Sequence, residues 1–311
     1  MEIRRIRTRD IREVLGLLDN AFSAEFHRWD VNLSRAERLL RFLLAGGRFP
    51  VRCLRVLGLE FEIWVATEGE KVIGALGQLE GKIPSLSGIA VAPEAQGKGV
   101  AKALLRHAFA DLRKKGWPLV LGSVRAENEK ALELCRSVGM EPYGELKIYA
   151  VPFPPRALPV IPKGITVRPA TKRDIDSVRS RVPEGLALKA RLDAAYSPWC
   201  LRLLGIHRSS LVAEVAGELQ GFIPLQVGQF WKAATIGAPL LFGPREPTFL
   251  ALLAGAVARA FSFRPSTLHI VLPTELLTLE GIVVHMGGEP IGTWVQLVRY
   301  LNRREGDGRA G

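Results

Sequence analysis

The sequence contains few cysteines, and no two of them lie close together. Cys53, Cys135 and Cys200 are the only three in 311 residues and form no CxxC pair, which excludes a zinc ribbon and a disulfide framework. The first ten residues, MEIRRIRTRD, lack the apolar core of a signal peptide. The longest apolar stretches, such as 249–263, are too short for a membrane span and are interrupted by Arg259. These absences predict a cytoplasmic protein without a membrane partner.

Positive charge is in excess, but it is not concentrated. Lys and Arg number 43 against 31 Asp and Glu, a formal charge of +12. Such an excess suits a polyanion, either nucleic acid or a phosphate-rich small molecule, although an arginine-rich composition alone explains it equally well. The charges are scattered, and neither an RNP-type aromatic motif nor zinc-finger spacing accompanies them. The charge therefore does not select nucleic acid as a partner.

A proline-rich segment divides the chain into two halves. Residues 151–164 include five prolines, so the segment cannot form a helix or a central strand and is typical of an extended linker. At about 150 residues per domain, the length also predicts two domains. We expect one domain at 1–150, the linker at 151–164, a second domain at 165–302 and a disordered tail at 303–311.

The two halves resemble each other. Three segments of the first half match three of the second in the same order: 3–14 with 167–178, 65–74 with 212–221, and 139–144 with 287–292. The offsets lie between 147 and 164 residues. Three matches in one order indicate an internal duplication.

Periodicity in the first half predicts strands and helices in irregular alternation. The expected helices are one capped by Thr8 whose apolar face runs from Ile11 to Phe22, and two more at 99–115 and 128–137. The expected strands are 2–7, 61–67, 71–81, 86–92, 119–124 and 143–151. This pattern predicts a mixed α/β fold of the α+β type.

The loop between the strand at 86–92 and the long helix is the most informative stretch. Gly97 and Gly99 allow a ligand to approach the backbone closely, and the start of a helix leaves several N–H groups unpaired. The partial positive charge of a helix N-terminus favours phosphate, and Lys98 and Lys102 add full charges. A bare GxG is usually a plain turn. Here the wider context changes the interpretation.

The loop resembles the signature of the GNAT superfamily of N-acetyltransferases. Gln96-x-x-Gly99-x-Ala101 follows Val91-x-Pro93 and opens a helix, as in the Gln/Arg-x-x-Gly-x-Gly/Ala motif of that family. Downstream, Asn128-x-x-Ala131-Leu132-x-Leu134 and then Gly139-Met140 is similar to a second family segment. A dinucleotide fingerprint fits less well, because the third glycine and the later acidic residue are missing. A Walker loop would need Ser or Thr where Gly99 stands.

The resemblance implies two tandem domains, each a mixed, mostly antiparallel twisted sheet flanked by helices. It also implies acetyl-CoA or another acyl-CoA as cofactor, and no metal. Family members hold the pyrophosphate with backbone N–H groups of this loop, and the pantetheine arm on the edge of the preceding strand. Asn128 matches a position that contacts the cofactor arm, although it is equally suited to capping its helix. The implied cofactor-binding residues are Ile89, Ala90, Val91, Gln96, Gly97, Lys98, Gly99, Val100, Ala101, Lys102 and Asn128.

The catalytic residues depart from the family pattern. Family members transfer the acyl group directly to a neutral amine, and an acid protonates the departing thiolate. Cys135 stands where the family has a tyrosine acid, and a small buried hydrophobe is the better explanation of it. Ser87 stands where the family has a glutamate base, which leaves Glu80 on the neighbouring strand as the nearest carboxylate. Tyr143, Tyr149 and His27 are further candidates, each also explained by packing.

The second half lacks the loop. Its equivalent, 244–249, contains Pro247, which has no N–H donor, the bulky Phe249, and the negative charge of Glu246. The sequence thus predicts an N-acetyltransferase whose first half is active and whose second half retains only the fold. The acceptor would be a primary amine on a small molecule or a protein. A non-catalytic acyl-CoA sensor is the alternative, and a nucleic-acid-associated protein a third. The oligomeric state stays open.

Overall fold

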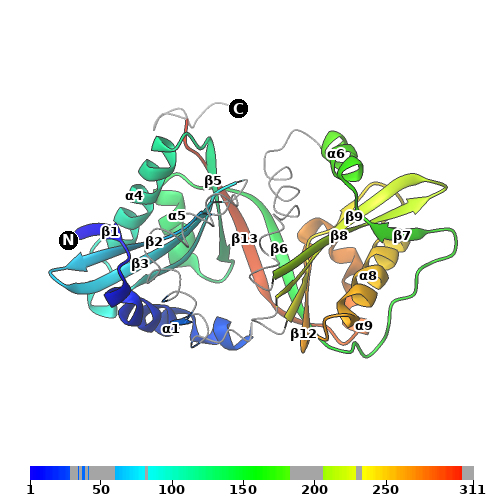
Figure 1. The fold of residues 1–311 in the computed structure, drawn as a ribbon, viewed down its shortest axis with the longest axis horizontal. Helices are drawn as coiled ribbons and strands as arrows, with labels where there is room; N and C mark the ends of the chain where they lie inside the picture. The colour runs from blue at the N-terminus through cyan, green and yellow to red at the C-terminus, as the bar shows by residue number, and fades with distance from the viewer. Residues whose placement is uncertain are drawn as a thin grey trace. The chain divides into compact units, whose positions relative to one another are not determined.

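The computed structural model describes residues 1–28, 34, 37–38, 41, 60–80, 83–182, 206–228 and 233–302. The chain forms two compact units, one of residues 1–143 with 295–311 and one of residues 144–294 (Figure 1). The expected tail at 303–311 lies outside the described residues. No helix in the described part of the chain is both long and apolar enough to cross a bilayer.

The first unit is a mixed sheet with helices on both faces. Its strands follow the order β1-β2-β3-β4-β5-β13, antiparallel from β1 to β4 and parallel between β4 and β5. Figure 1 shows α1 and α4 on opposite sides of β2 and β3. The elements are β1 (Glu2–Arg5), η1 (Thr8–Asp10), α1 (Ile11–Arg28), β2 (Glu60–Glu68), β3 (Lys71–Glu80), β4 (Ser85–Val91), η2 (Pro93–Ala95), α4 (Val100–Lys114), β5 (Leu119–Arg125), α5 (Glu129–Ser137) and part of β13 (Glu289–Tyr300).

Two apolar clusters separate these layers. Leu104, Ala108 and Leu112 of α4 are fully buried against Ala66 and other residues of one sheet face. Ile11 and Val14 of α1 are equally buried, and Val14 packs on the opposite face. The spacing of apolar residues along α4 thus gives the core-facing stripe that the sequence predicts.

The second unit repeats this plan. Its strands follow the order β6-β12-β10-β9-β8-β7, with β11 paired to β9. α8 packs on one face of the sheet and α6 on the other. The elements are β6 (Glu141–Pro152), β7 (Thr166–Pro169), α6 (Lys172–Arg181), β8 (Ile206–Val215), β9 (Glu218–Gly228), β10 (Ala233–Ile236), β11 (Leu240–Leu241), α8 (Arg245–Phe261), β12 (Thr267–Pro273), η4 (Thr274–Leu279), α9 (Glu280–His285) and part of β13.

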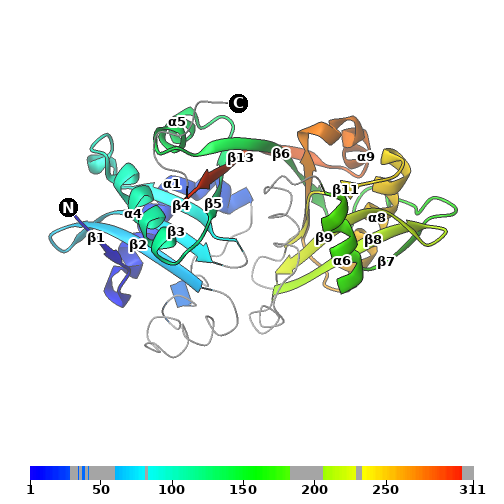
Figure 2. The same cartoon turned by 90° about the horizontal axis from the view of Figure 1, so that it is seen from above.

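The compact units do not coincide with the sequence repeats, because each repeat gives its last strand to the other unit. From residue 144 onward, β6 belongs to the second unit, where Tyr149 and Val151 are fully buried (Figures 1 and 2). From residue 295 onward, β13 belongs to the first unit and buries Leu297 there. The Leu301 N–H donates to the Pro118 carbonyl at 2.8 Å, which fixes the end of this strand beside β5.

The duplication extends to individual contacts. Ala66 pairs with Gly74 between β2 and β3, and Ala213 pairs with Gly221 between β8 and β9, with a register shift after each pair. A Cβ at Gly74 would lie 2.8 Å from Val100, and one at Gly221 would lie 2.7 Å from Thr248. A helix therefore crosses the sheet at the same glycine in both units, and residue 100 corresponds to residue 248.

The start of each repeat also matches. Arg4 makes two hydrogen bonds to Asp10, of 2.6 and 3.0 Å, and Arg168 makes two to Asp174, of 2.7 and 2.9 Å. Thr171 caps the following helix, as its side chain accepts from the Asp174 N–H. The corresponding prediction for Thr8 was wrong: Thr8 begins the 3-10 turn η1, and Asp10 accepts the Arg7 N–H at 2.7 Å. Position 7 holds arginine where the second repeat has its capping threonine.

Candidate functional site

The loop at 96–102 presents backbone N–H groups to solvent. Gly97 and Gly99 have positive φ angles of 74° and 80°, and a Cβ added to either would meet no atom of the described residues within 4 Å. Gly99 is the N-cap of α4, and the first helical bond joins the Ala103 N–H to the Gly99 carbonyl. The N–H groups of residues 100–102 precede that bond and lie outside the helical ladder. The first turn holds no acidic residue, so the site suits an anion.

Gln96 secures the loop to the strand before it. Its Nε2 donates to the Val91 carbonyl at 3.3 Å, and its backbone N–H donates to Pro93. Beside it, Lys71 pairs with Glu94 at 2.5 Å. The loop is therefore fixed at its strand end and open at its helix end.

β4 carries a bulge that sequence reasoning missed. Ala75 pairs with Ala90 and Gly77 pairs with Ser87, so β4 has one more residue than β3 between these pairs. Gly88 lies in this bulge with a φ of 60°. A bulge leaves an extra backbone group outside the ladder and is common beside active sites. A glycine inside a predicted strand was the available signal.

β4 and β5 separate next to the bulge. Their ladder pairs Ser85 with Leu121 and Leu86 with Gly122, and no pair beyond these joins the described residues of the two strands. Ile89 and Val91 are half-buried against the α4 side of the sheet. The edge of β4 at residues 89–91 is thus available to an extended ligand that reaches in from the loop.

Asn128 caps α5, as one of its two interpretations predicts. Its side-chain oxygen accepts the Ala131 N–H at 3.1 Å, and its side chain is exposed. The cap uses the oxygen of the amide group. The amide nitrogen is a separate donor, so capping is compatible with a contact to a cofactor arm.

Glu80 belongs to a buried charge network and not to the loop. Its carboxylate accepts from Lys115 at 2.5 Å, from Gln78 at 2.7 Å and from Trp117 at 2.9 Å. In the ladder between β3 and β4, Gly74 pairs with Val91 next to the loop, whereas Leu79 pairs with Ser85 at the opposite end. Glu80 follows Leu79 and therefore lies near the C-terminus of α4. That helix of 15 residues spans about 22 Å. Glu80 therefore does not share a site with the loop.

Lys115 lies among three clustered carboxylates in this network, and Arg5 pairs with one of them, Glu62, at 2.6 Å. Lys115 lies 2.5 Å from Glu80, 2.9 Å from Asp111 and 3.5 Å from Glu62. Burial alone would lower the pKa of Lys115, but its hydrogen bonds to Glu80 and Asp111 and the charge of Glu62 outweigh burial and raise it. The three carboxylates have metal-ligand spacing. The Lys115 ammonium group and the Arg5 guanidinium group already supply positive charge to this cluster.

The other catalytic candidates occupy separate environments. Cys135 is buried in the first unit's core, and burial raises the pKa of its thiol to about 11. Ser87 is exposed on β4 directly before the bulge, and Tyr143 is half-buried in β6. Tyr149 is buried in the core of the second unit, where burial raises its pKa to about 12. The side chain of His27 lies outside the described residues.

Comparisons with known proteins identify the fold. Residues 60–140 match the family model of the acetyltransferase (GNAT) domain. A tandem GNAT protein from the clavulanic acid biosynthesis pathway matches 98% of this chain and 99% of its own at 16% identity, with a TM-score of 0.60. A GCN5-related N-acetyltransferase from Sphaerobacter thermophilus matches 97% and 96% at 17% identity, with a TM-score of 0.62. Residues 60–140 therefore resemble a GNAT domain, and the chain as a whole has the fold of tandem GNAT proteins.

The likeness to solved structures establishes the fold over nearly the whole chain. A putative acetyltransferase from Pyrococcus horikoshii also matches, over 96% of this chain and 89% of its own at 12% identity, with a TM-score of 0.55. No curated protein matches the sequence. The GNAT fold supports acyl-CoA-dependent acetyl transfer to amine acceptors in general. At these identities it does not specify the acceptor.

The second unit replaces the glycine loop with helix. Since residue 248 corresponds to residue 100, Pro247 corresponds to Gly99. Yet α8 begins at Arg245, three residues before the equivalent of the α4 start. Glu246 lies in this additional turn. The backbone that is open in the first GNAT unit is therefore wound into helix in the second.

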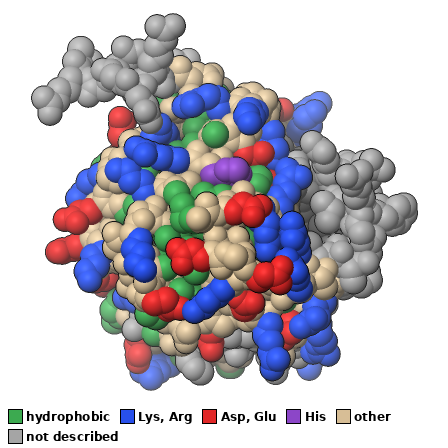
Figure 3. All heavy atoms as spheres, turned by 90° about the vertical axis from the view of Figure 1, so that its left-hand side faces the viewer, with side chains coloured by type: hydrophobic (Ala, Val, Ile, Leu, Met, Phe, Trp, Pro, Cys, Tyr) green, Lys and Arg blue, Asp and Glu red, His purple; other side chains and the backbone are tan. Residues whose placement is uncertain are grey.

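The face of the first unit drawn in Figure 3 carries charges of both signs. Figure 3 shows one face on the side of the first GNAT unit, where Lys and Arg side chains alternate with Asp and Glu. A polyanion is favoured by a contiguous basic stripe or patch. This face provides a mixture of both signs.

Proposed function

We propose that the chain is an acetyl-CoA-dependent N-acetyltransferase whose active site lies in the first GNAT unit. The observation that carries this proposal is the pairing of an open glycine loop at a helix N-terminus with the separated strands β4 and β5. The loop fits a pyrophosphate, and the strand edge fits an extended amide-bearing arm. The second unit has a helical turn in place of the loop and would act as a structural partner.

The proposed cofactor contacts follow the chain from loop to strand. The N–H groups of residues 97–102 would bind the pyrophosphate, with Lys98 and Lys102 contributing charge. Gln96 would hold this loop against β4 through its bond to Val91. The backbone of Ile89, Ala90 and Val91 would pair with the amide groups of the arm. Asn128 would add a side-chain donor from the start of α5.

When bound, acetyl-CoA supplies a thioester whose acetyl group passes to a neutral amine, with the CoA thiolate as leaving group and the proton that the amine loses passing to solvent. The bulge at Gly88 would direct a backbone N–H at the oxygen on which negative charge develops. Ser87, exposed beside that bulge, would orient the amine by a hydrogen bond. Since Glu80 is committed to Lys115, we propose no carboxylate base, and proximity and charge stabilisation would provide most of the rate.

Cys135 and Tyr143 are the two candidates for the acid that protonates the departing thiolate. Cys135 would remain a protonated thiol at neutral pH because burial raises its pKa to about 11. Its burial among core side chains favours a packing role. Tyr143 is half-buried and remains the better candidate for a phenol that protonates the thiolate.

A non-catalytic acyl-CoA sensor is the second candidate function. It is favoured by the burial of Cys135 at the family's tyrosine position and by Ser87 at the position of its glutamate. Incubating the protein with acetyl-CoA and a panel of primary amines, and measuring free thiol release, separates the two. The enzyme releases thiol in proportion to amide formed. The sensor binds acetyl-CoA with no release above background.

A further inference from the structure

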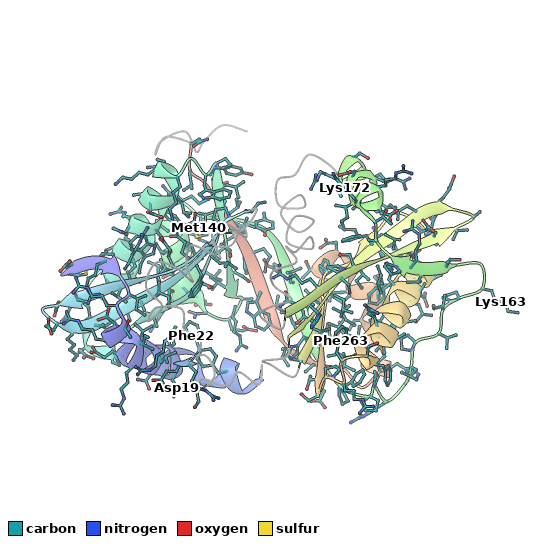
Figure 4. All side chains as sticks on the ribbon, in the orientation of Figure 1. Asp19, Phe22, Met140, Lys163, Lys172 and Phe263 are labelled. Carbon is teal, nitrogen blue, oxygen red and sulfur yellow. The ribbon has the colours of Figure 1, made fainter. Side chains whose placement is uncertain are left out.

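The apolar stripe of α1 extends beyond the part that the core covers. Ile11 and Val14 are completely buried, whereas Leu18, Phe22 and Phe26 follow at helical spacing and are half-buried. The Phe22 and Phe26 rings lie 6.1 Å apart. In Figure 4, Phe22 points from α1 toward the sheet, and Asp19 points away from it. Three large apolar side chains thus remain partly exposed at this end of the helix.

The helix is distorted at the same place. Phe22 has φ −133° and ψ 18°, values outside the helical region, so α1 bends there. No proline or Gly/Ser pair causes this bend, as residues 21–24 are AFSA. Backbone in sparsely populated regions is often found where a side chain serves a site.

This end of α1 faces the bulge of β4. A Cβ at Gly88 would lie 3.5 Å from Leu18 Cδ2. On the same face of the sheet, Phe61 and Leu79 pair across β2 and β3, and each is 39% exposed. Ser87 contributes a hydroxyl group. Leu18, Phe61 and Leu79 thus place apolar side chains on this face, with the Ser87 hydroxyl group beside them.

We propose that Leu18 and Phe22 form the apolar wall of the acceptor site, and that the acceptor is a primary amine carried on an aromatic or other large hydrocarbon group. This proposal rests on the proposed function, which places the reacting carbonyl at the bulge. An apolar environment favours the neutral form of an amine, the form that can attack. It discriminates against polyamines and short polar amines, whose additional polar groups would lose hydration there.

Binding of amines to the full-length protein saturated with CoA tests the proposal without relying on turnover. Calorimetric titration with 2-phenylethylamine is compared with ethanolamine and spermidine. We expect 2-phenylethylamine to bind at least tenfold more tightly than either, since a few apolar contacts contribute this much discrimination. Equal affinities, or tighter binding of spermidine, would overturn the proposal.

Variants of Phe22 locate the wall. Phe22→Ala should weaken 2-phenylethylamine binding about tenfold and raise its KM with little change in kcat, and Phe22→Leu should restore most of the affinity. Phe261→Ala, at a 43% exposed position of the second unit, is the matched control and should change neither. Unchanged affinity in Phe22→Ala would overturn the assignment. If acetyl-CoA itself fails to bind the unaltered protein, the proposed function fails and this inference with it.

Discussion

The two GNAT units share a sheet register, an arginine–aspartate pair and a helix that crosses at a glycine, yet they differ at the start of that helix. In the first unit, three residues before α4 form an open loop with two glycines of positive φ. In the second, the corresponding residues are the first turn of α8, with Pro247 in place of Gly99. The fold therefore tolerates both forms, and the proposed ligand site depends on where one helix begins.

The units also differ beneath the other end of the same helix. The first unit places the half-buried Lys115 among three carboxylates, two of which also accept from Gln78. Residues 74 and 100 of the first unit correspond to 221 and 248 of the second. By the same correspondence, positions 78, 80 and 115 match Leu225, Val227 and Phe263. Leu225 and Val227 are buried in its apolar core. A buried ionic network and an apolar cluster thus support the same helix, so the network is not required by the fold.

The largest effect is expected from charge in the glycine loop. Gly99→Asp places a carboxylate next to the proposed pyrophosphate site, and like charges about 4 Å apart near a surface repel by about 4 kcal/mol. Affinity for CoA should fall roughly a thousandfold. Gly99→Asn is the matched control, since asparagine tolerates positive φ without the charge. The change Pro247→Asp should leave affinity unaltered, and an equal loss there would contradict a single active unit.

Weaker packing of the exchanged strand β13 should destabilise the first unit, which receives it. Leu297→Ala removes a buried side chain from the first unit's core, at a cost of about 3 kcal/mol. CoA binding should raise only the thermal transition of the first unit. That CoA-protected transition should be lowered by Leu297→Ala and not by Leu272→Ala, which alters the second unit's core. The reverse pattern would show that the strands are not exchanged.

Disruption of the ionic network around Lys115 should lower the stability of the protein, and replacement of the network residues together should restore most of it. Lys115→Phe removes the cation that Glu80 and Asp111 share, while Glu62 keeps its pair with Arg5, and should reduce the free energy of unfolding by about 3 kcal/mol. Replacing five network residues with their second-unit equivalents should recover most of the lost free energy of unfolding, since apolar packing can replace a buried ion cluster. Urea denaturation of the single and combined variants measures this. The combined variant carries Glu62→Ser, Gln78→Leu, Glu80→Val, Asp111→Arg and Lys115→Phe.

The two arginine–aspartate pairs should behave alike. Hydrogen bonds from Arg168 hold the pKa of Asp174 well below its usual range, so its stabilisation is present above the unfolded pKa of about 3.9 and is lost as pH falls through the folded value. Asp174→Asn should cost about 1 kcal/mol at pH 7 and less below pH 4. Asp10→Asn should match it in the first unit. Denaturation curves at several pH values would detect a unit that departs from this pattern.

The smallest effect is expected at Cys135. Because it is buried and its pKa is raised to about 11, iodoacetamide at pH 8 should alkylate it slowly, and Cys135→Ala should change kcat less than twofold. A tenfold loss of kcat with an altered pH profile would instead assign it the acid role.

Local signals in the sequence predicted the repeats, the loop and the Asn128 cap, because each depends on neighbouring residues. The exchange of β6 and β13 could not be predicted, since the apolar pattern of a strand does not specify which sheet it joins. Glu80 appeared available as a base because sequence gives no side-chain partners, and Lys115 lies 35 residues away. The bulge at Gly88 depends on pairing register, which a single strand does not reveal.

Calorimetric titration of the full-length protein with acetyl-CoA tests the central claim most directly. The account predicts one site per chain, abolished by Gly99→Asp and retained in Pro247→Asp. Two sites per chain, or one site that survives Gly99→Asp, would contradict the assignment of cofactor binding to the first unit alone.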